Sequence, residues 1–186
     1  RNLNPSLVNS LLKNVIKKRE SINKKKFSQS SVPSWFVTAL KKNQLNLQNI
    51  IENISSEPSL HLVFKNKNLL EIFKEEKYKT TDLSAFIINK KKIIDLEDYN
   101  KGHWWVQDLS SMLPIHLSPE IKFKKVLDMC AAPGGKAFQT ICSDNDVTLN
   151  DISLKRSKKL KTNLNRLNFY NEIQNYNALD MPEIEK

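Results

Sequence analysis

The chain has 186 residues, of which 39% are hydrophobic, and carries a formal net charge of +10. No apolar run approaches the ~20 residues that a membrane-spanning helix needs, so the composition predicts a soluble globular protein without a membrane partner. Cys130 and Cys142 are too few for a disulfide framework and have no companion at metal-ligand spacing. We therefore predict no metal site and a cytoplasmic location. The positive charge favours nucleic acid as a partner. The alternative is that the many lysines reflect the composition of the genome and are merely solvated.

The first predicted element is an amphipathic helix from Pro5 to about Lys18, whose apolar residues recur at helical spacing. A basic run that ends at Lys24–Lys26 and the polar stretch Ser28–Ser31 follow, and both are typical of a linker. Residues 1–28 form the first predicted region. Because the sequence begins without a methionine and stops after a charged segment, we interpret both ends as cuts.

Residues 29–118 are predicted to form a small mixed α/β domain. Ser34 is the candidate cap of a short helix that reaches Leu40, before an Asn/Gln-rich segment. The further predicted elements are a strand at Ser59–Phe64, a helix at Leu69–Glu76 and short strands at Ala85–Ile88 and Ile93–Ile94.

The region from residue 119 to 186 has a more regular pattern. The predicted elements are a buried strand Lys125–Met129, a helix from Gly135, a strand Asp146–Asn150, a helix from about Ser153 and a third strand within Ile173–Ala178. Strands that alternate with helices indicate half of a doubly wound parallel sheet. The predicted fold class is therefore α/β, with the first half of a Rossmann-like sheet after a mixed domain and a helical tail.

Two of the three glycines in the chain are adjacent, directly after a strand and a proline. We call the segment Cys130–Lys136 the glycine loop. Small residues in such a turn let the backbone approach a ligand and direct free N–H groups at a carboxylate or phosphate. Asp151 follows at the end of the next predicted strand, where a carboxylate can accept the hydroxyls of a ribose. These features alone fit either a dinucleotide or an adenosylmethionine site.

The string Asp128–Lys136 resembles the cofactor loop of the Nol1/Nop2/Sun family of RNA cytosine-5 methyltransferases, in particular its bacterial small-subunit ribosomal RNA members. The segment Gly102–Ser111 is similar to the Gln-Asp-x-x-Ser segment that precedes this loop. Its Gln107, Asp108 and Ser110 are expected to start and cap the helix that supports the loop, with Asp108 as the candidate N-cap. Asp151, Arg156 and Arg166 are similar to residues of the family's second strand and following helix. Two departures are Ala137, where a threonine usually follows the lysine, and the bulky Trp104-Trp105 pair.

The resemblance extends more loosely toward the N-terminus. Leu7–Lys13 is similar to the last helix of an antitermination-factor-like RNA-binding domain, and Pro33–Trp35 and Leu60–Phe64 resemble an intermediate RNA-binding region. The resemblance thus implies three parts: 1–28 as the end of the N-terminal domain, 29–118 as the RNA-binding region, and 119–186 as half of the methyltransferase domain.

The resemblance also implies S-adenosyl-L-methionine as the methyl donor. The glycine loop would surround its methionine part, Asp151 would hold the ribose and Asp180 would lie beside the adenine, unless Asp180 is an ordinary turn residue. The cofactor-binding residues expected on this basis are Cys130, Ala131, Ala132, Pro133, Gly134, Gly135, Lys136, Asp151 and Asp180. Lys136 could instead be a solvated surface lysine. Asp128 could contact the donor from the end of its strand, or could only accept hydrogen bonds from loop amides.

No residue of the chain is predicted to be catalytic. Cytosine C5 becomes nucleophilic only after a thiolate adds to C6, and in this family the thiolate comes from Pro-Cys and Thr-Cys motifs after the cofactor loop. This sequence has neither motif, so Cys130 is interpreted as a small loop residue and Cys142 as core. Trp104 and Trp105 could stack on a base, but a core and a domain-seam position are preferred for them.

The sequence therefore predicts a fragment of an S-adenosylmethionine-dependent RNA cytosine-C5 methyltransferase, acting on ribosomal RNA in the parent protein and inactive alone. The alternative from another class is a non-catalytic RNA-binding protein with a vestigial nucleotide loop. A nicotinamide-dependent dehydrogenase fragment is disfavoured, because the Gly-x-Gly-x-x-Gly turn is absent. The oligomeric state is not predicted.

Overall fold

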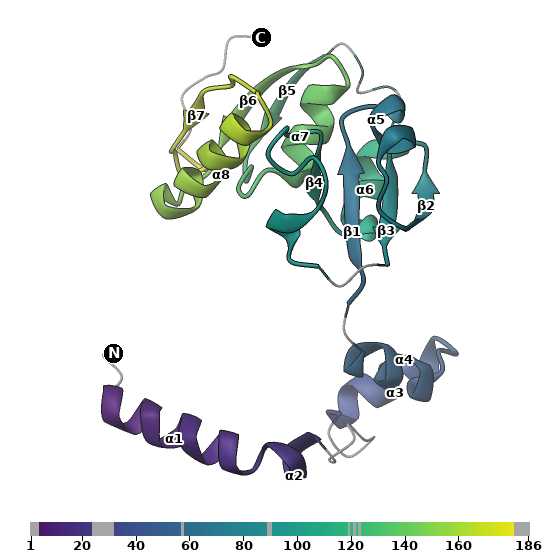
Figure 1. The fold of residues 1–186 in the computed structure, drawn as a ribbon, viewed down its shortest axis with the longest axis vertical. Helices are drawn as coiled ribbons and strands as arrows, with labels where there is room; N and C mark the ends of the chain where they lie inside the picture. The colour runs from purple at the N-terminus through teal and green to yellow at the C-terminus, as the bar shows by residue number, and fades with distance from the viewer. Residues whose placement is uncertain are drawn as a thin grey trace. The chain divides into compact units, whose positions relative to one another are not determined.

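The computed structural model describes residues 4–23, 32–56, 58–88, 91–118, 120, 122 and 124–180. The chain divides into two compact units, Arg1–Pro58 and Ser59–Lys186, which we call the helical unit and the α/β unit (Figure 1). The three-part division by function into 1–28, 29–118 and 119–186 remains a prediction. None of the described helices is long and apolar enough to cross a membrane.

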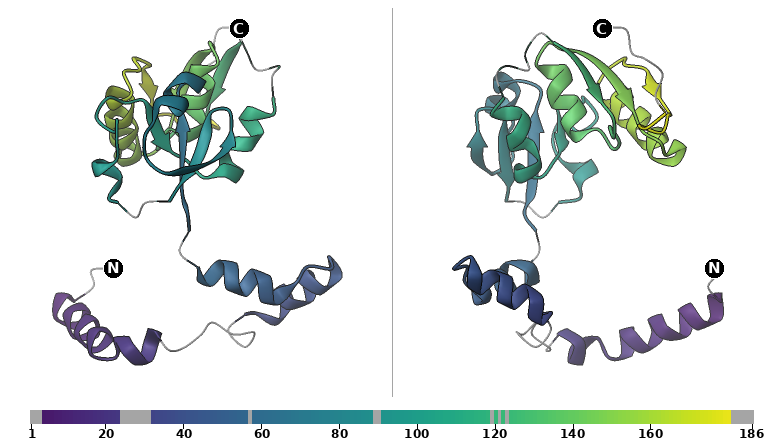
Figure 2. Two further views of the ribbon diagram at one scale, coloured as in Figure 1. Left: turned by 45° about the vertical axis from the view of Figure 1, so that its right-hand side comes forward. Right: turned by 180° about the vertical axis from the view of Figure 1, so that it is seen from behind.

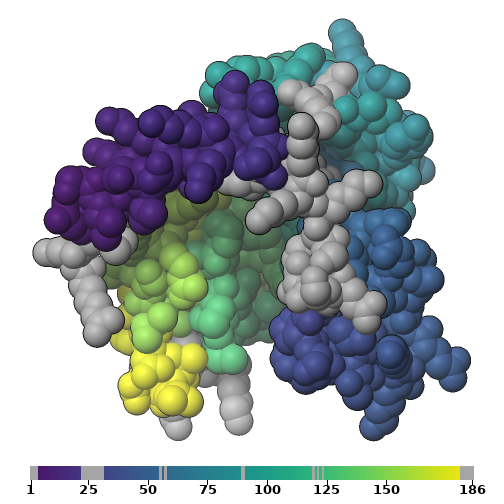
Figure 3. Space-filling model, turned by 90° about the horizontal axis from the view of Figure 1, so that it is seen from below, coloured from purple at the N-terminus to yellow at the C-terminus, as the bar shows by residue number. Residues whose placement is uncertain are grey.

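The helical unit contains α1 (Pro5–Lys17), α2 (Arg19–Asn23), α3 (Ser34–Lys42) and α4 (Leu47–Ser55). The amphipathic helix predicted from Pro5 is confirmed, and the Asn4 side chain caps it by accepting a hydrogen bond from the Ser6 N–H at 3.0 Å. No residue of α1, which is drawn in purple in Figure 3, is buried.

Two predictions in this unit have other outcomes. The expected cap of α3 is wrong, because Pro33 occupies the cap position and Ser34 is already the first helical residue. Lys24–Lys26 and Ser28–Ser31 lie outside the described residues.

An antiparallel sheet, which we call sheet A, forms the first half of the α/β unit. Its strands β1 (Leu60–Phe64), β2 (Lys77–Thr81), β3 (Ser84–Ile87) and β4 (Trp104–Val106) lie in the order β2-β3-β1-β4. Short runs of mainly apolar residues correctly predicted β1 and β3.

Four further elements of this half differ from the prediction. The predicted helix Leu69–Glu76 is shorter, because α5 spans only Lys67–Ile72, and neither β2 nor β4 was predicted. The predicted strand Ile93–Ile94 is wrong: residues Ile93–Asp95 form a 3₁₀ turn, η2, in which Ile94 is 60% exposed.

A parallel sheet, which we call sheet B, confirms the predicted half of a Rossmann-like fold. Its strands are β5 (Lys125–Asp128), β6 (Asp146–Asn150) and β7 (Ile173–Gln174), in the order β5-β6-β7. Parallel neighbours need crossover connections, and helices α7 (Gly135–Cys142) and α8 (Leu154–Arg166) supply them. Both helices cover the same face of sheet B, and α7 lies between the two sheets (Figure 2).

The adjacent tryptophans of β4 point to opposite faces of sheet A and so enter different cores. Trp104 lies in a cluster with Phe64 and Phe73, whereas Trp105 packs with Phe138 of α7 in the cluster that includes sheet B. Their exposed fractions are 0% and 3%. Base stacking by this pair is therefore excluded in this arrangement, and the preferred core and seam positions are confirmed.

The C-terminal end of α8 fastens sheet B to sheet A. The Arg166 guanidinium donates hydrogen bonds to the Tyr99 and Trp104 carbonyl oxygens at 2.9 and 3.1 Å, and stacks over the Tyr99 ring. Gly102 has φ +66° and lies so close to α8 that a Cβ would stand 2.0 Å from the Arg166 carbonyl oxygen. Only glycine fits there, because neither backbone segment can move aside.

Candidate functional site

The glycine loop connects β5 to α7, as the sequence predicts. Gly134 caps α7 with φ +124°, and a Cβ on it would stand 1.9 Å from Cζ of Phe138. A Cβ on Gly135 would stand 3.2 Å from Cδ of Gln107. Gly134 is thus required by conformation as well as by packing, since it lies where L side chains are strained. At Gly135 a side chain would only press on that of Gln107.

Hydrogen bonds from three neighbouring elements hold the backbone of the loop. The Cys130 N–H donates to Oδ1 of Asp128 at 3.1 Å, and the Ala131 N–H donates to the Asn150 carbonyl oxygen at 2.9 Å. From α8, Nδ2 of Asn163 donates to the Pro133 carbonyl oxygen at 2.9 Å. The loop conformation is therefore fixed by β5, β6 and α8 together.

Asp151 follows β6 and is fully buried. Its Oδ1 accepts hydrogen bonds from the Ser153 N–H at 2.9 Å and from Nε of Arg156 at 3.1 Å, and Nη2 of Arg156 lies 2.9 Å from the same oxygen in an ion pair. Among the described residues, Oδ2 accepts only the long bond from the Ala132 N–H at 3.3 Å. Asp151 therefore ties the loop to α8 through Oδ1 and retains acceptor capacity on Oδ2.

An open hollow of about 420 Å³ lies beside the glycine loop. One wall is formed by the loop and the end of β5, and the other by the residues that lead into α6 (Leu109–His116). The lining residues are Val106, Gln107, Asp108, Ser111, Asp128, Cys130, Ala131, Ala132, Pro133, Gly135 and Lys136. Six of the nine predicted site residues thus share one hollow, while Gly134, Asp151 and Asp180 are not in its lining.

The hollow contains both signs of charge. Burial raises the pKa of the Asp128 carboxyl; the Cys130 N–H and the Lys136 charge oppose this effect, and the Asp151 charge adds to it. Lys136 is exposed, and its Nζ donates to Oγ of Ser111 at 3.2 Å. Hydrogen bonds from Ser110 and Ser111 lower the pKa of Asp108, which caps α6 as predicted. An ammonium and a carboxylate therefore border the loop.

Asp180 lies apart from these residues. It is exposed, stands six residues after the end of β7 and donates its own N–H to the Asn177 carbonyl oxygen at 2.9 Å. The structure does not bring it to the hollow, so its role beside an adenine remains a prediction.

Comparison with known proteins relates this arrangement to a family. Residues 114–185 match the family model described as 16S rRNA methyltransferase RsmB/F, and this segment contains sheet B and the glycine loop. The resemblance noted from the loop sequence is thereby confirmed.

Named relatives agree with the family match. Over 90 residues the chain is 38% identical to a ribosomal RNA small subunit methyltransferase B from Photorhabdus laumondii, a match that covers 47% of this chain and 21% of that protein. It is 34% identical over 91 residues to a human 28S rRNA (cytosine(4447)-C(5))-methyltransferase, covering 47% of this chain and 11% of the relative. The matched part is thus a small part of either relative.

A solved structure supports the fold. A methyltransferase homologue from Pyrococcus horikoshii superposes with a TM-score of 0.58 at 19% identity, over 70% of this chain and 48% of that chain. At this identity the likeness concerns the fold, and it confirms the predicted Rossmann-like class.

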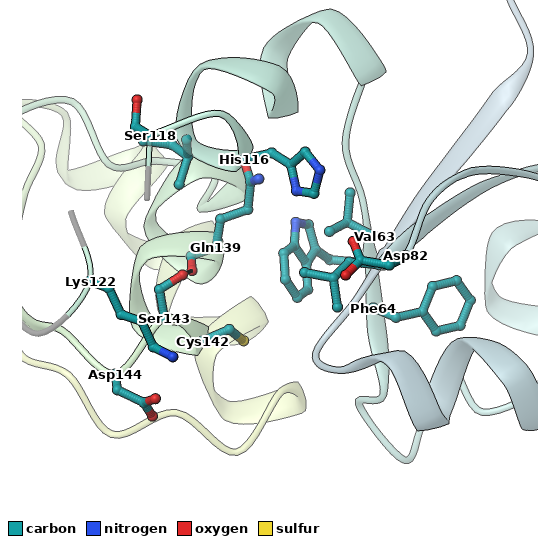
Figure 4. A pocket seen from close by; sticks show the side chains of 13 residues that line it. Val63, Phe64, Asp82, His116, Ser118, Lys122, Gln139, Cys142, Ser143 and Asp144 are labelled. Atoms are coloured by element: carbon teal, nitrogen blue, oxygen red, sulfur yellow. Dashed lines mark hydrogen bonds between the residues drawn. The ribbon is translucent and has the colours of Figure 1, made fainter. Parts of the chain in front are cut away.

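The two cysteines of the chain lie at opposite ends of the segment formed by the glycine loop and α7. Cys130 is exposed in the loop, whereas Cys142 ends α7 beside a second hollow of about 340 Å³ that Trp105 and Gln139 also line (Figure 4). Burial raises the pKa of the Cys142 thiol to about 11, so it stays protonated at neutral pH. No group of three His, Cys, Asp or Glu side chains is placed to hold a metal within the described ranges.

A buried polar chain supports the loop and was not predicted as such. Nε1 of Trp105 donates to Oε1 of Gln107 at 2.8 Å, Nε2 of Gln107 donates to Oε1 of Gln139 at 2.6 Å, and Nε2 of Gln139 donates to the Met112 carbonyl oxygen at 3.1 Å. Sequence reasoning assigned Gln107 only to the start of α6. Its contact with Gly135 shows that it also packs beneath the loop.

Proposed function

We propose that this chain is part of an S-adenosylmethionine-dependent ribosomal RNA cytosine-C5 methyltransferase, and that the glycine loop holds the methyl donor. The observation that carries the proposal is the double-glycine turn between β5 and α7, fixed by hydrogen bonds and open on one side to a hollow. The family match and the names of the relatives support the reaction and the RNA substrate.

The residues around the loop fit this donor. The donor carries a carboxylate and an amino group on its methionine part, and the hollow offers the Lys136 ammonium and the Asp128 carboxylate. Asp151 would accept ribose hydroxyls through Oδ2, since Oδ1 already has three donors. Asp180 is assigned to the adenine on the sequence resemblance alone. When bound, the donor supplies the methyl group on its sulfonium.

The chain's own residues would bind and orient the donor rather than activate the cytosine. Neither cysteine stands in a Pro-Cys or Thr-Cys motif, and Cys142 is protonated at neutral pH. We assign RNA as the partner and the cytoplasm as the location on the basis of the ribosomal RNA relatives.

Calorimetric binding of S-adenosylhomocysteine to the 186-residue chain tests the donor site. We expect Lys136→Gln to weaken binding by about 1 to 3 kcal/mol, because a charge-assisted hydrogen bond is lost. Lys74→Gln is the matched control, because Lys74 is also exposed but lies in the connection between α5 and β2 and does not line the hollow. No binding by the unaltered chain, or an equal effect of both variants, would refute the assignment.

A transfer assay separates the proposal from its alternative. We expect the chain alone to transfer no tritiated methyl group to small-subunit ribosomal RNA, because it supplies no thiolate for C6. Binding of RNA without any binding of S-adenosylhomocysteine would instead favour a non-catalytic RNA-binding protein. Methyl transfer that is lost in Cys130→Ser would make Cys130 a nucleophile and overturn this account.

A further inference from the structure

Helix α8 carries six basic residues and no acidic residue among its thirteen. Two of the six have structural partners: Arg156 pairs with Asp151, and Arg166 bonds the Tyr99 and Trp104 carbonyl oxygens. The remaining four are exposed, and in the described part of the chain no ion pair involves them: Lys155, Lys158, Lys159 and Lys161. We call these four the lysine face of α8.

The lysine face does not stabilise the helix that carries it. Lys155 is three and four residues from Lys158 and Lys159, and Lys158 is three residues from Lys161. At these spacings side chains are neighbours on a helix surface, so like charges repel. Lys155 also lies in the first turn, where the helix dipole disfavours a cation. The charges therefore oppose helix stability and suit an external anion.

A shallow groove of about 410 Å³ runs between α8 and the chain around β7. Lys158 and Lys161 line its α8 side, and Asn175 and Glu172 line the other side, where Glu172 is the sole acidic residue of the lining. Figure 1 shows α8 and β7 next to each other on the flank of the α/β unit. An extended anion with regularly spaced charges fits such a groove better than a compact ligand does.

This face is connected to the glycine loop. Helix α8 begins three residues after Asp151, and its Asn163 donates to the Pro133 carbonyl oxygen. A polyanion that follows α8 would thus run beside the proposed donor site. We propose that the lysine face of α8, with the groove toward β7, binds backbone phosphates of the RNA substrate. The choice of RNA as the polyanion rests on the proposed function.

Lysine side chains are suited to bind backbone phosphates without base specificity. An ammonium is a compact, strongly hydrated charge on a flexible stem, so it can contact a phosphate without selecting a base. The face would therefore contribute affinity and orientation, while sequence selection would come from elsewhere.

The test compares two quadruple variants of the 186-residue chain with equal loss of charge. One replaces Lys155, Lys158, Lys159 and Lys161 with glutamine; the control replaces exposed lysines outside α8, namely Lys67, Lys74, Lys92 and Lys125. Binding of a single-stranded RNA oligonucleotide is measured over a series of salt concentrations, and circular dichroism checks that both variants fold.

We expect the α8 variant to reduce the slope of log K against log salt by up to about 2.8, at ~0.7 per phosphate contact, and the control to change it by less than ~0.7. Equal changes in both variants, or no RNA binding by the unaltered chain, would overturn the proposal. Binding to anionic lipid vesicles but not to RNA would also overturn it.

Calorimetry with S-adenosylhomocysteine separates this test from that of the donor site. None of the four α8 lysines lines the hollow beside the glycine loop, so the α8 variant should bind S-adenosylhomocysteine as the unaltered chain does. An unchanged RNA slope together with normal binding of this ligand would refute the lysine face alone. If the unaltered chain binds RNA but does not bind S-adenosylhomocysteine, the donor site alone is refuted.

Discussion

The inner and outer faces of α8 both carry basic residues but use them differently. On the inner side Leu160, Leu164 and the C-cap residue Leu167 are fully buried, and the two arginines at the edge of that face bond carbonyl or carboxylate oxygens. On the outer side the four lysines have solvent as their environment. A guanidinium is weakly hydrated and offers several donors in fixed directions, so it costs less to bury than an ammonium. The two arginines of α8 thus stabilise the fold, and its four exposed lysines remain available to a partner.

The largest expected effect tests how closely the inner side of α8 is fitted. Gly102→Ala places a Cβ against the Arg166 carbonyl oxygen at a positive φ, so we expect a loss of about 3 kcal/mol or more in the free energy of unfolding. Thermal unfolding followed by circular dichroism measures it. A loss below ~1 kcal/mol would mean that the backbone at the junction between α8 and sheet A can shift at little cost to make room for the methyl group.

Arg166→Met asks whether the inner arginine matters through its hydrogen bonds or through its packing. The methionine keeps much of the apolar stem but leaves two carbonyl oxygens without their donor, and we expect a loss of about 2 to 3 kcal/mol. Burial lowers the pKa of Arg166, in agreement with its partly desolvated position. Lys159→Met on the outer side is the control, with an expected change within ~0.5 kcal/mol. Similar losses in both variants would contradict the contrast between the faces.

Arg156→Gln probes the intermediate case, since this side chain is 56% exposed yet pairs with a fully buried Asp151. Solvent screening reduces the value of the pair, and we expect a loss of only about 1 kcal/mol. Urea denaturation, with the slope checked for constancy, gives the difference. A loss as large as that of Arg166→Met would show that the cost of leaving the buried Asp151 carboxylate unpaired outweighs the solvent screening of Arg156.

Lys158→Gln carries the smallest expected effect and the opposite sign. It removes two like-charge neighbours, Lys155 and Lys161, so the free energy of unfolding should rise by about 0.5 kcal/mol at low salt. The rise should disappear in high salt because exposed charges are then screened. A decrease in stability at low salt would show that Lys158 has a stabilising partner in the free protein.

Local patterns predicted the positions of the sheet B elements well, because strands and amphipathic helices leave a pattern in neighbouring residues. The burial of the first strand was wrong: no residue of β5 is buried, and Met129 lies outside it and is 51% exposed. Apart from the cap of α3, the wrong elements lie in or next to sheet A. The strand β2 has the sequence Lys-Tyr-Lys-Thr-Thr at the sheet edge and lacks alternation of apolar and polar residues. Ile93 and Ile94 looked like a strand because isoleucine favours one, yet they are 40% and 60% exposed in a turn.

The candidate site was predictable where it is contiguous in sequence. The glycine loop and the cap Asp108 follow from short segments, whereas Gln107 and Gln139 meet across 32 residues and leave no local signal. The double role of Asp151 was likewise hidden, since its bonds to Arg156 and Ala132 depend on how α8 packs. Partners that are distant along the chain are decided by tertiary packing.

The contrast between the two cysteines provides a built-in reporter. A thiol-reactive dye should label Cys130, which is exposed at the edge of the glycine loop, and spare Cys142, whose thiol has a pKa of about 11 and is largely covered. The chain therefore needs no engineered labelling position. A molecule bound in the hollow should slow the reaction of the dye with Cys130, which lines it. The labelling rate would therefore report binding without any added cysteine.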